Sequence, residues 1–380
     1  MEATFLTGIH INKVRHLENI DIPLSANTRK NLILTGKNGS GKTSTLEALA
    51  DALESIEPTS ALSRLKKASN ILGNKEGICQ STLSCDFSGN LHTKYVSGQF
   101  VLARFNDTRK IHIRVSKNIE KVELKSVYSL VDSPAKELGK YMASLKATQA
   151  FAKNDGKQQR AQEIETWFQR IENILRTIYS DDSLKLHFDI ETFQFSILMD
   201  SREPFDFNTM SAGYAAVFDI IGDLMMRMES QHRYDLEGIV LIDEIETHLH
   251  VELQKQIVPI LTELFPNIQF IMTTHSPFIL NSASNAVIYD LEKHMLVKDG
   301  LTNLPYDGIV ESYFGADLLS QELRGKFEQY RALVQKADLT DEDFAVAAEL
   351  ELYLDEVPDY LALDFATEYS RLKLELANRG

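Results

Sequence analysis

The residues from Gly36 to Thr43 carry the clearest chemical pattern in this sequence. They read G-K-N-G-S-G-K-T and fill every position of the pattern G-x-x-x-x-G-K-[ST]. Glycines allow backbone N–H groups to turn inward around a phosphate, and a helix start adds the positive end of its dipole. The pattern predicts that Lys42 reaches the β- and γ-phosphates of ATP and that the Thr43 hydroxyl ligates Mg²⁺. The residues expected to contact the nucleotide are Gly36, Lys37, Asn38, Gly39, Ser40, Gly41, Lys42, Thr43 and Ser44.

Two adjacent acids follow a second apolar run. Asp243 and Glu244 come directly after Ile239-Val-Leu-Ile242, which reads as a buried strand. Open α/β sheets hold ligands at the carboxyl ends of their strands. We therefore expect Asp243 to hold the hydrated Mg²⁺ and Glu244 to act as general base toward the attacking water. Acids at a strand end can also be merely solvated, but a phosphate loop in the same chain favours the catalytic interpretation.

Two further sites are candidates for contacts with phosphate. His275 follows the apolar run 268–274 and lies 32 residues after Asp243, so it should emerge at the same sheet edge. We expect it to contact the γ-phosphate and the attacking water, although a histidine just past a strand is often a surface residue. Ser211 and Gly213 open a helix and offer a hydroxyl and N–H groups to an anion. By itself this second pattern also fits an ordinary helix cap.

Strands and helices of the expected lengths surround these motifs. Strand, helix and strand in alternation predict a parallel sheet with right-handed crossovers. A break at 153–156 divides the helical stretch 134–180 into a hairpin, and Pro358 divides the last helical stretch. The other strands are expected at 5–11, 17–22, 31–35, within 78–125 and within 184–199, and at 238–244 and 268–274; the other helices are expected at 41–56, 212–229 and 251–265.

The composition is that of a globular protein. The chain has 380 residues, 43% of them hydrophobic and 25% charged, which excludes disorder as its main state. Its two cysteines, Cys79 and Cys85, match no metal-site spacing and supply no disulfide framework. No signal peptide and no run of about 18 apolar residues is present, so we expect a soluble, cytoplasmic protein without a membrane segment.

The net charge of −15 is unevenly distributed. Residues 60–180 contain 20 basic and 11 acidic residues, whereas residues 338–380 contain 3 and 12. The basic region 60–180 makes DNA or an acidic protein a candidate partner, although a solvated face is an equally good interpretation. The acidic tail could dock an effector or form an outer face. Its apolar stripe must pack against something: Leu361, Phe365, Tyr369, Leu372 and Leu376.

The motifs, in this order, resemble those of ABC-type ATPases of the SMC/RecF-like class. NLILTGKNGSGKTSTLEAL is similar to their Walker A motif, LIDEIETHLH to Walker B with the D-loop, and TTHSP to the H-loop. The resemblance implies an α/β fold: an ABC-ATPase head with a mixed/parallel sheet, an N-terminal antiparallel β part, a helical insert lobe and C-terminal helices. The expected domains are 1–130 (head with Walker A), 131–182 (insert lobe), 183–337 (head with signature, Walker B and H-loop) and 338–380 (acidic helical tail).

The resemblance also implies an oligomer. Such heads form a homodimer, or a higher homo-oligomer, with two ATP molecules sandwiched between subunits. Ser211 and Gly213 would then touch the γ-phosphate bound by the other chain, and His248 would lie at the interface. MSAGYAA lacks the second Gly and the Gln of the transporter-type signature. Two residues are candidates for the Q-loop residue, Gln99 and Asn106, which flank an expected strand, and the sequence does not choose between them.

Three functions fit these motifs. IDEIETHLH and FIMTTHSPFIL are similar to ATPases of bacterial anti-phage systems (OLD-like, Septu or PARIS), which favours an ATPase that dimerises on ATP and regulates a partner effector. We expect that effector to be a nuclease on another polypeptide, because the sequence shows neither a TOPRIM acidic cluster nor an HNH arrangement. The alternatives are a RecF-like DNA-binding ATPase of DNA repair and a self-contained nuclease-ATPase.

Overall fold

The computed structural model describes residues 3–56, 82–107, 119–302, 309, 321–336, 338–355 and 363–377. Cys79, the strand expected at 110–115 and part of the basic region 60–180 lie outside the described residues. The chain divides into two compact units, Met1–Asn303 and Leu304–Gly380. Within the described part of the chain, no helix combines the length and apolar character needed to cross a membrane.

A mixed six-stranded sheet forms the centre of the first unit, in the order β12-β11-β3-β10-β9-β5. Five strands are parallel and β12 runs antiparallel to β11. β3, β10 and β11 are buried at every position, since helices or the second sheet cover both faces. The mixed/parallel sheet predicted from the sequence is confirmed. The strands are β3 (Asn31–Thr35), β5 (Phe100–Phe105), β9 (Glu237–Ile242), β10 (Ile268–Thr273), β11 (Ala286–Asp290) and β12 (Met295–Val297).

The register brings the carboxyl ends of the parallel strands to one edge. Ile242 of β9 pairs with Phe105 of β5 and with Met272 of β10. On the other side, Asp290 of β11 pairs with Thr35 of β3. The segments that follow β3, β5, β9, β10 and β11 therefore all start at this edge, which we call the carboxyl edge.

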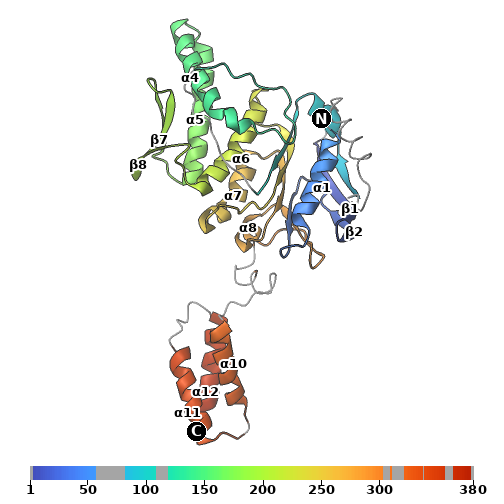
Figure 1. Cartoon of the computed structure of the whole chain (residues 1–380), viewed down its shortest axis with the longest axis vertical. Coiled ribbons are helices and arrows are strands. Elements are labelled where there is room, and N and C mark those ends of the chain that lie inside the picture. The colour runs from blue at the N-terminus through green and yellow to red at the C-terminus, as the bar shows by residue number, and fades with distance from the viewer. Residues whose placement is uncertain are drawn as a thin grey trace, which may run out of the picture. The chain divides into compact units, whose positions relative to one another are not determined.

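An antiparallel sheet of order β2-β1-β4 covers one face of the main sheet, with helix α1 (Lys42–Glu54) packed into the same core. Figure 1 shows α1 beside β1 and β2 and on the opposite side of the main sheet from α6 and α7. The predicted N-terminal antiparallel β part is confirmed. Its strands are β1 (Phe5–Val14), β2 (Leu17–Pro23) and β4 (Thr82–Ser88), and the short helix α3 (Leu91–Val96), which the sequence did not predict, connects β4 to β5.

Helices α4 and α5 form the predicted hairpin of the insert lobe (green in Figure 1). The hairpin breaks at Gly156, whose φ of 73° suits glycine. α6 is buried on nearly all sides and packs against the lobe and the main sheet. The lobe also carries an antiparallel sheet, β6-β7-β8, of which β8 was not predicted. Bounds are η1 (Pro134–Glu137), α4 (Leu138–Asn154), α5 (Gln158–Tyr179), β6 (Lys185–Asp189), β7 (Gln194–Met199), β8 (Arg202–Asp206), α6 (Ala212–Glu229), α7 (Val251–Leu264) and α8 (Pro277–Ser282).

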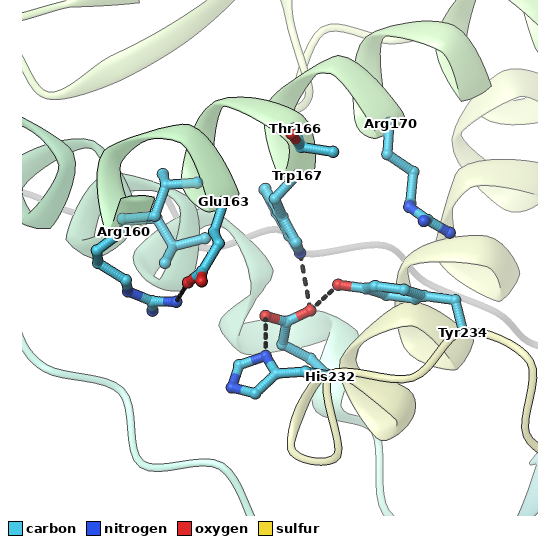
Figure 2. A pocket seen from close by; sticks show the side chains of 10 residues that line it. Arg160, Glu163, Thr166, Trp167, Arg170, His232 and Tyr234 are labelled. Carbon is cyan, nitrogen blue, oxygen red and sulfur yellow. Dashed lines mark hydrogen bonds and ion pairs between the residues drawn. The ribbon is translucent and has the colours of Figure 1, made fainter. Parts of the chain in front are cut away.

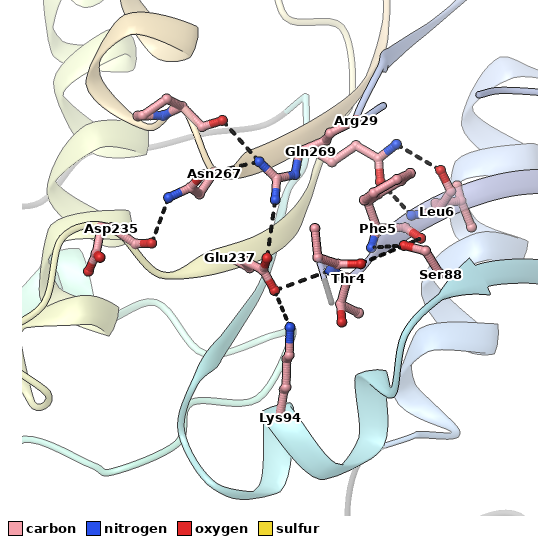
Figure 3. Close-up of polar contacts among 12 residues, drawn as sticks. Thr4, Phe5, Leu6, Arg29, Ser88, Lys94, Asp235, Glu237, Asn267 and Gln269 are labelled. Atoms are coloured by element: carbon pink, nitrogen blue, oxygen red, sulfur yellow. Dashed lines mark hydrogen bonds and ion pairs between the residues drawn. The ribbon is translucent and has the colours of Figure 1, made fainter. Parts of the chain in front are cut away.

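A polar node joins the N-terminal segment to the main sheet at its amino edge (Figure 3). Glu237 at the start of β9 accepts hydrogen bonds from Lys94 Nζ at 2.6 Å and from the Thr4 backbone N at 3.2 Å, and Arg29 Nη2 lies 3.4 Å from its Oε1. Gln269 of β10 exchanges both amide hydrogen bonds with the backbone of Leu6. This node fixes the register between two sheets at the edge opposite the phosphate loop.

The described part of the second unit contains three helices: α10 (Gln321–Gln335), α11 (Asp341–Leu354) and α12 (Leu363–Ala377). We expected the acidic tail to begin at 338, whereas the compact unit begins at Leu304 and includes α10. The reason is the core of the unit, in which α10 packs against both tail helices. Tyr369, Leu372 and Leu376 of the tail stripe are thus buried within this unit, while Leu361 and the side chain of Phe365 lie outside the described residues. The core also includes Phe327, Tyr330, Val334, Ala347, Leu350 and Leu354.

Candidate nucleotide site

Three glycines with positive φ shape the loop between β3 and α1. Gly36, Gly39 and Gly41 have φ of 131°, 84° and 98°, a region that favours glycine. A Cβ on Gly36 would lie 2.8 Å from Ser40 Oγ, and one on Gly41 would lie 2.7 Å from Leu17 Cδ1. Only glycine lets the loop close at these points. Ser40 Oγ is buried without a hydrogen-bond partner among the described residues, as a group awaiting a ligand would be.

Lys42 folds back over this loop. Its Nζ donates to the carbonyls of Gly36 at 2.8 Å and Lys37 at 3.0 Å. Burial lowers the pKa of Lys42, and the carboxylates of Glu244, Glu246, Asp243 and Asp290 oppose this shift. The ammonium group is therefore partly desolvated and faces acids, so a phosphate entering the loop would gain a strong charge-assisted partner.

Thr43 and Asp243 meet as the motifs predicted. Thr43 Oγ1 donates to Asp243 Oδ1 at 3.2 Å, and the hydroxyl of Thr273 at the end of β10 donates to the same oxygen at 2.6 Å. Asp243 is only 4% exposed. A hydroxyl and a buried carboxylate held together are oxygen ligands of the kind that Mg²⁺ prefers beside nucleotide phosphates. The two residues therefore fit the cation that the phosphate loop implies.

Glu244 and His275 also lie together. His275 Nε2 is 4.0 Å from Glu244 Oε1, and the two side chains are 32% and 41% exposed, respectively. Glu244 has a φ of 43°, unusual for a residue with a side chain, and its backbone N donates to Thr273 Oγ1 at 2.7 Å. This hydrogen bond anchors the turn in which the carboxylate leaves the strand direction. Strain of this kind concentrates at functional sites.

Two acids at the same edge were missed in the sequence. Glu246 Oε1 accepts from the backbone N of His275 at 2.5 Å, while its buried Oε2 has no hydrogen-bond partner among the described residues. Glu292, after β11, accepts from the backbone N of Lys37 at 3.3 Å and pairs with Lys37 Nζ at 2.9 Å. The run AVIYDLE, a short apolar strand ending in acids, could have revealed Glu292. Nothing local distinguishes Glu246 from the other acids of its loop.

Ser211 and Gly213 have different surroundings. Ser211 is the N-cap residue of α6, yet its side chain makes no capping hydrogen bond and is exposed. Gly213 is buried: a Cβ there would lie 3.0 Å from the backbone O of His248 and 3.3 Å from Leu253 Cδ1. The structure thus gives Gly213 a packing contact with its own D-loop and leaves Ser211 as the side chain able to reach another molecule. His250 caps α7 through Nδ1.

The structure distinguishes the two Q-loop candidates. Gln99 precedes β5 and therefore lies at the amino edge of the sheet. Asn106 follows β5 at the carboxyl edge, where the backbone N of Asp243 donates to the carbonyl of Phe105 at 2.9 Å. Only Asn106 therefore lies beside the acids that follow β9.

Comparisons with known proteins show what this chain is similar to. Residues 98–281 match the family model described as "AAA domain, putative AbiEii toxin, Type IV TA system". The chain is 24% identical over 359 residues to the Septu protein PtuA of Bacillus mycoides, and 33% identical over 132 residues to the Retron Ec83 probable ATPase of Escherichia coli. The chain is therefore similar to proteins described as AAA domains and as probable ATPases. The resemblance to anti-phage ATPases that the sequence motifs indicated is confirmed.

The matches cover unequal shares of each protein. The first alignment spans 87% of this chain and 47% of the PtuA chain, so this chain spans about half the length of that relative. The second spans 33% of this chain and 24% of the retron protein. Among solved structures, an SMC head bound to the C-winged helix domain of ScpA covers 75% of this chain and 94% of its own chain, at 13% identity and a TM-score of 0.40.

Proposed function

We propose that this chain is an ATPase of the ABC/AAA type that hydrolyses ATP with Mg²⁺, dimerises when ATP is bound, and regulates a separate effector, a nuclease, in anti-phage defence. The observation that carries the proposal is the convergence at the carboxyl edge. The Thr43–Asp243 pair and the Glu244–His275 pair lie after the ends of three separate strands, β3, β9 and β10, and the carboxylates of Asp243 and Glu244 act on the Lys42 ammonium group. Phosphate binding, cation binding and water activation each have a residue of suitable chemistry at this edge.

The proposed roles follow from these contacts. Backbone N–H groups of the loop and Lys42 would hold the phosphates, and Thr43 and Asp243 would hold Mg²⁺, which neutralises charge on the phosphate oxygens when bound. Glu244 would accept a proton from the attacking water. His275 would orient that water and donate to the γ-phosphate. Thr273 would serve both acids, because its hydroxyl bonds Asp243 and the backbone of Glu244.

The exposure of the site supports dimerisation. About a third or more of the side-chain surface of Glu244 and of His275 is exposed to solvent. Phosphoryl transfer depends on excluding bulk water around positioned groups. A second protomer would close the site, and Ser211, exposed at the start of α6 with its hydroxyl unused in capping, is the residue we assign to the partner's γ-phosphate.

The role in defence rests on the relatives. The similarity to a Septu protein and to retron ATPases supports regulation of an effector. Among the described residues, no group of three or more His, Cys, Asp or Glu side chains could hold a metal ion. The nuclease is therefore proposed as a partner chain rather than as a part of this one.

Three measurements test the proposal. Phosphate release should depend on Mg²⁺, and sedimentation should show a larger species with Mg-ATP than with ADP. A pull-down with this protein from its native host should recover a nuclease whose activity changes with ATP. Absence of turnover and of a nucleotide-dependent species would overturn the proposal. Salt-sensitive DNA binding without an effector would favour the DNA-repair alternative.

A further inference from the structure

The insert lobe contains a cavity of about 450 Å³ that the nucleotide site does not use. Its wall is the face of α5 from Arg160 to Arg170, and its other side is Glu229 at the end of α6 with His232 and Tyr234 of the following loop (Figure 2). This volume lies in the range of small-molecule sites. Six of its ten lining side chains are charged, histidine or threonine, so a purely apolar ligand such as a lipid chain does not suit it.

Glu229 is the hub that organises this cavity. Its side chain is only 4% exposed. Oε1 accepts from Tyr141 OH at 2.7 Å, and Oε2 accepts from Trp167 Nε1 at 2.8 Å and from Tyr234 OH. His232 Nδ1 lies 3.5 Å from Oε1. Figure 2 shows Trp167, Tyr234 and His232 converging on this carboxylate. With these partners around both oxygens, Glu229 orients the aromatic walls rather than offering itself to a ligand.

Arg170 supplies the recognition chemistry. Its Cζ lies 4.1 Å from the centroid of the Tyr234 ring, and among the described residues no ion pair of Arg170 with a carboxylate is found. A guanidinium stacked on a ring keeps its N–H edge for a phosphate or carboxylate. At the other end of the wall, Arg160 Nη1 pairs with Glu163 Oε2 at 3.0 Å. Glu163 could accept hydrogen bonds from hydroxyl or amino groups of a ligand.

The spacing of these groups suggests the size of the ligand. Arg170 and Glu163 are seven residues apart on one helix, about 10 Å along its axis. An isolated phosphate would reach one of them, whereas a nucleotide is long enough to reach both. We propose that this α5 pocket binds a nucleoside monophosphate, either free or as the phosphorylated end of a single strand. Arg170 binds the phosphate, the aromatic wall contacts the base, and Glu163 accepts from the sugar or base.

A single tryptophan makes a fluorescence test specific to this pocket. Trp167 is the single tryptophan of the chain and lines the pocket, so its fluorescence reports on this site. One arm titrates AMP, GMP, CMP and UMP into the full-length protein, and the other titrates a single-stranded oligonucleotide with a 5′-phosphate. A saturable change in Trp167 emission is expected in at least one arm, and the arm that responds identifies the source of the nucleotide.

Two variants and two controls test the assignment. Arg170→Ala should weaken the apparent affinity at least about tenfold, because it removes a charge-assisted contact. Thr166→Tyr fills the cavity without changing charge and should also weaken binding; circular dichroism checks that both variants fold. Arg233→Ala removes the same charge from an exposed arginine paired with Asp235, outside the pocket, and should bind normally.

The last control is Lys42→Ala, which separates this site from the phosphate loop and should leave the fluorescence response intact. The inference is overturned if neither arm gives a saturable change, if Arg170→Ala and Thr166→Tyr respond like the wild type, or if Lys42→Ala abolishes the response. A response to an acidic peptide but not to either nucleotide arm also overturns it. Failure of ATP turnover would bear on the proposed function alone.

Discussion

Thr43 and Asp243 are 200 residues apart in the chain, yet Thr43 Oγ1 donates to Asp243 Oδ1 at 3.2 Å. The contact exists because β3 and β9 both pair with β10 in parallel and end at the same edge. The loop after β3 and the acid after β9 are therefore brought together by strand order rather than by any local pattern. The predictions below test what this edge does and what holds it in place.

Replacing Glu244 with Gln should stop hydrolysis while preserving ATP binding. The amide keeps the shape of the side chain but cannot accept the proton, and general-base contributions are about 10²- to 10⁴-fold in rate. ATP binding should then accumulate a stable dimer, visible by size-exclusion chromatography with Mg-ATP. Glu252→Gln, an exposed acid on α7, is the matched control and should turn over normally. Undiminished turnover in Glu244→Gln would remove Glu244 as the base.

Replacing Lys42 with Ala should abolish stabilisation by nucleotide. A ligand at 100 times its Kd stabilises a protein by about 2.7 kcal/mol, which appears as a rise in Tm. In the variant the loop loses its partly buried cation, so Mg-ATP should leave Tm unchanged. Lys255→Ala removes an equal charge from α7 and should keep the full rise. An equal rise in the Lys42 variant would place the nucleotide elsewhere.

Replacing Ser211 with Ala should weaken the ATP-dependent dimer without destabilising the monomer. Loss of a capping serine costs about 1 kcal/mol in general, but Ser211 makes no capping hydrogen bond here. The free energy of unfolding should therefore change by only a few tenths of a kcal/mol. Analytical ultracentrifugation with Mg-ATP measures the dimer, and urea unfolding without nucleotide measures stability. A large loss of stability would contradict this role.

Replacing Gly213 with Ala should separate the start of α6 from the D-loop. The added Cβ would lie 3.0 Å from the carbonyl of His248, and overpacking of this kind costs about 1–3 kcal/mol. We expect the opposite effect on stability for Gly325→Ala in α10, because no heavy atom of the described residues outside the helix backbone lies within 4 Å of the added Cβ. That variant should be stabilised by about 0.5–1 kcal/mol through its helix propensity. Urea unfolding of both variants checks the sign of each change.

The antiparallel sheet should lose stability as pH rises. His10 lies 2.6 Å from Asp86 and 2.7 Å from Asp21, and these carboxylates raise the pKa of His10, Asp86 most strongly. Its stabilisation is complete below the unfolded pKa of about 6.5 and is lost as pH rises through the higher folded value. The difference in unfolding free energy between wild type and His10→Gln should shrink accordingly between pH 6 and 9.

Local patterns predicted most of the elements. Ala212–Glu229 and Asn31–Thr35 form as expected, because long amphipathic or fully apolar runs have few alternatives. The sequence pattern did not reveal α3, which has only six residues and too little periodicity to detect. It also missed β8, which contains Pro204 and two charged residues at its start. The sequence pattern did not assign α10 to the second unit, because the apolar residues of α10 form a core only when they pack against α11 and α12.

The sequence by itself determined the chemistry of the site. The spacing of the phosphate loop and the acids at the end of an apolar run are local features, and residue type alone limits what they can do. Only the tertiary structure decided which of these groups meet. Strand order and packing place Asn106 rather than Gln99 beside the acids, bring Glu246 to the backbone of His275, and bury Gly213. They also form the α5 pocket around Glu229. Such contacts join residues far apart in the chain, so no local periodicity records them.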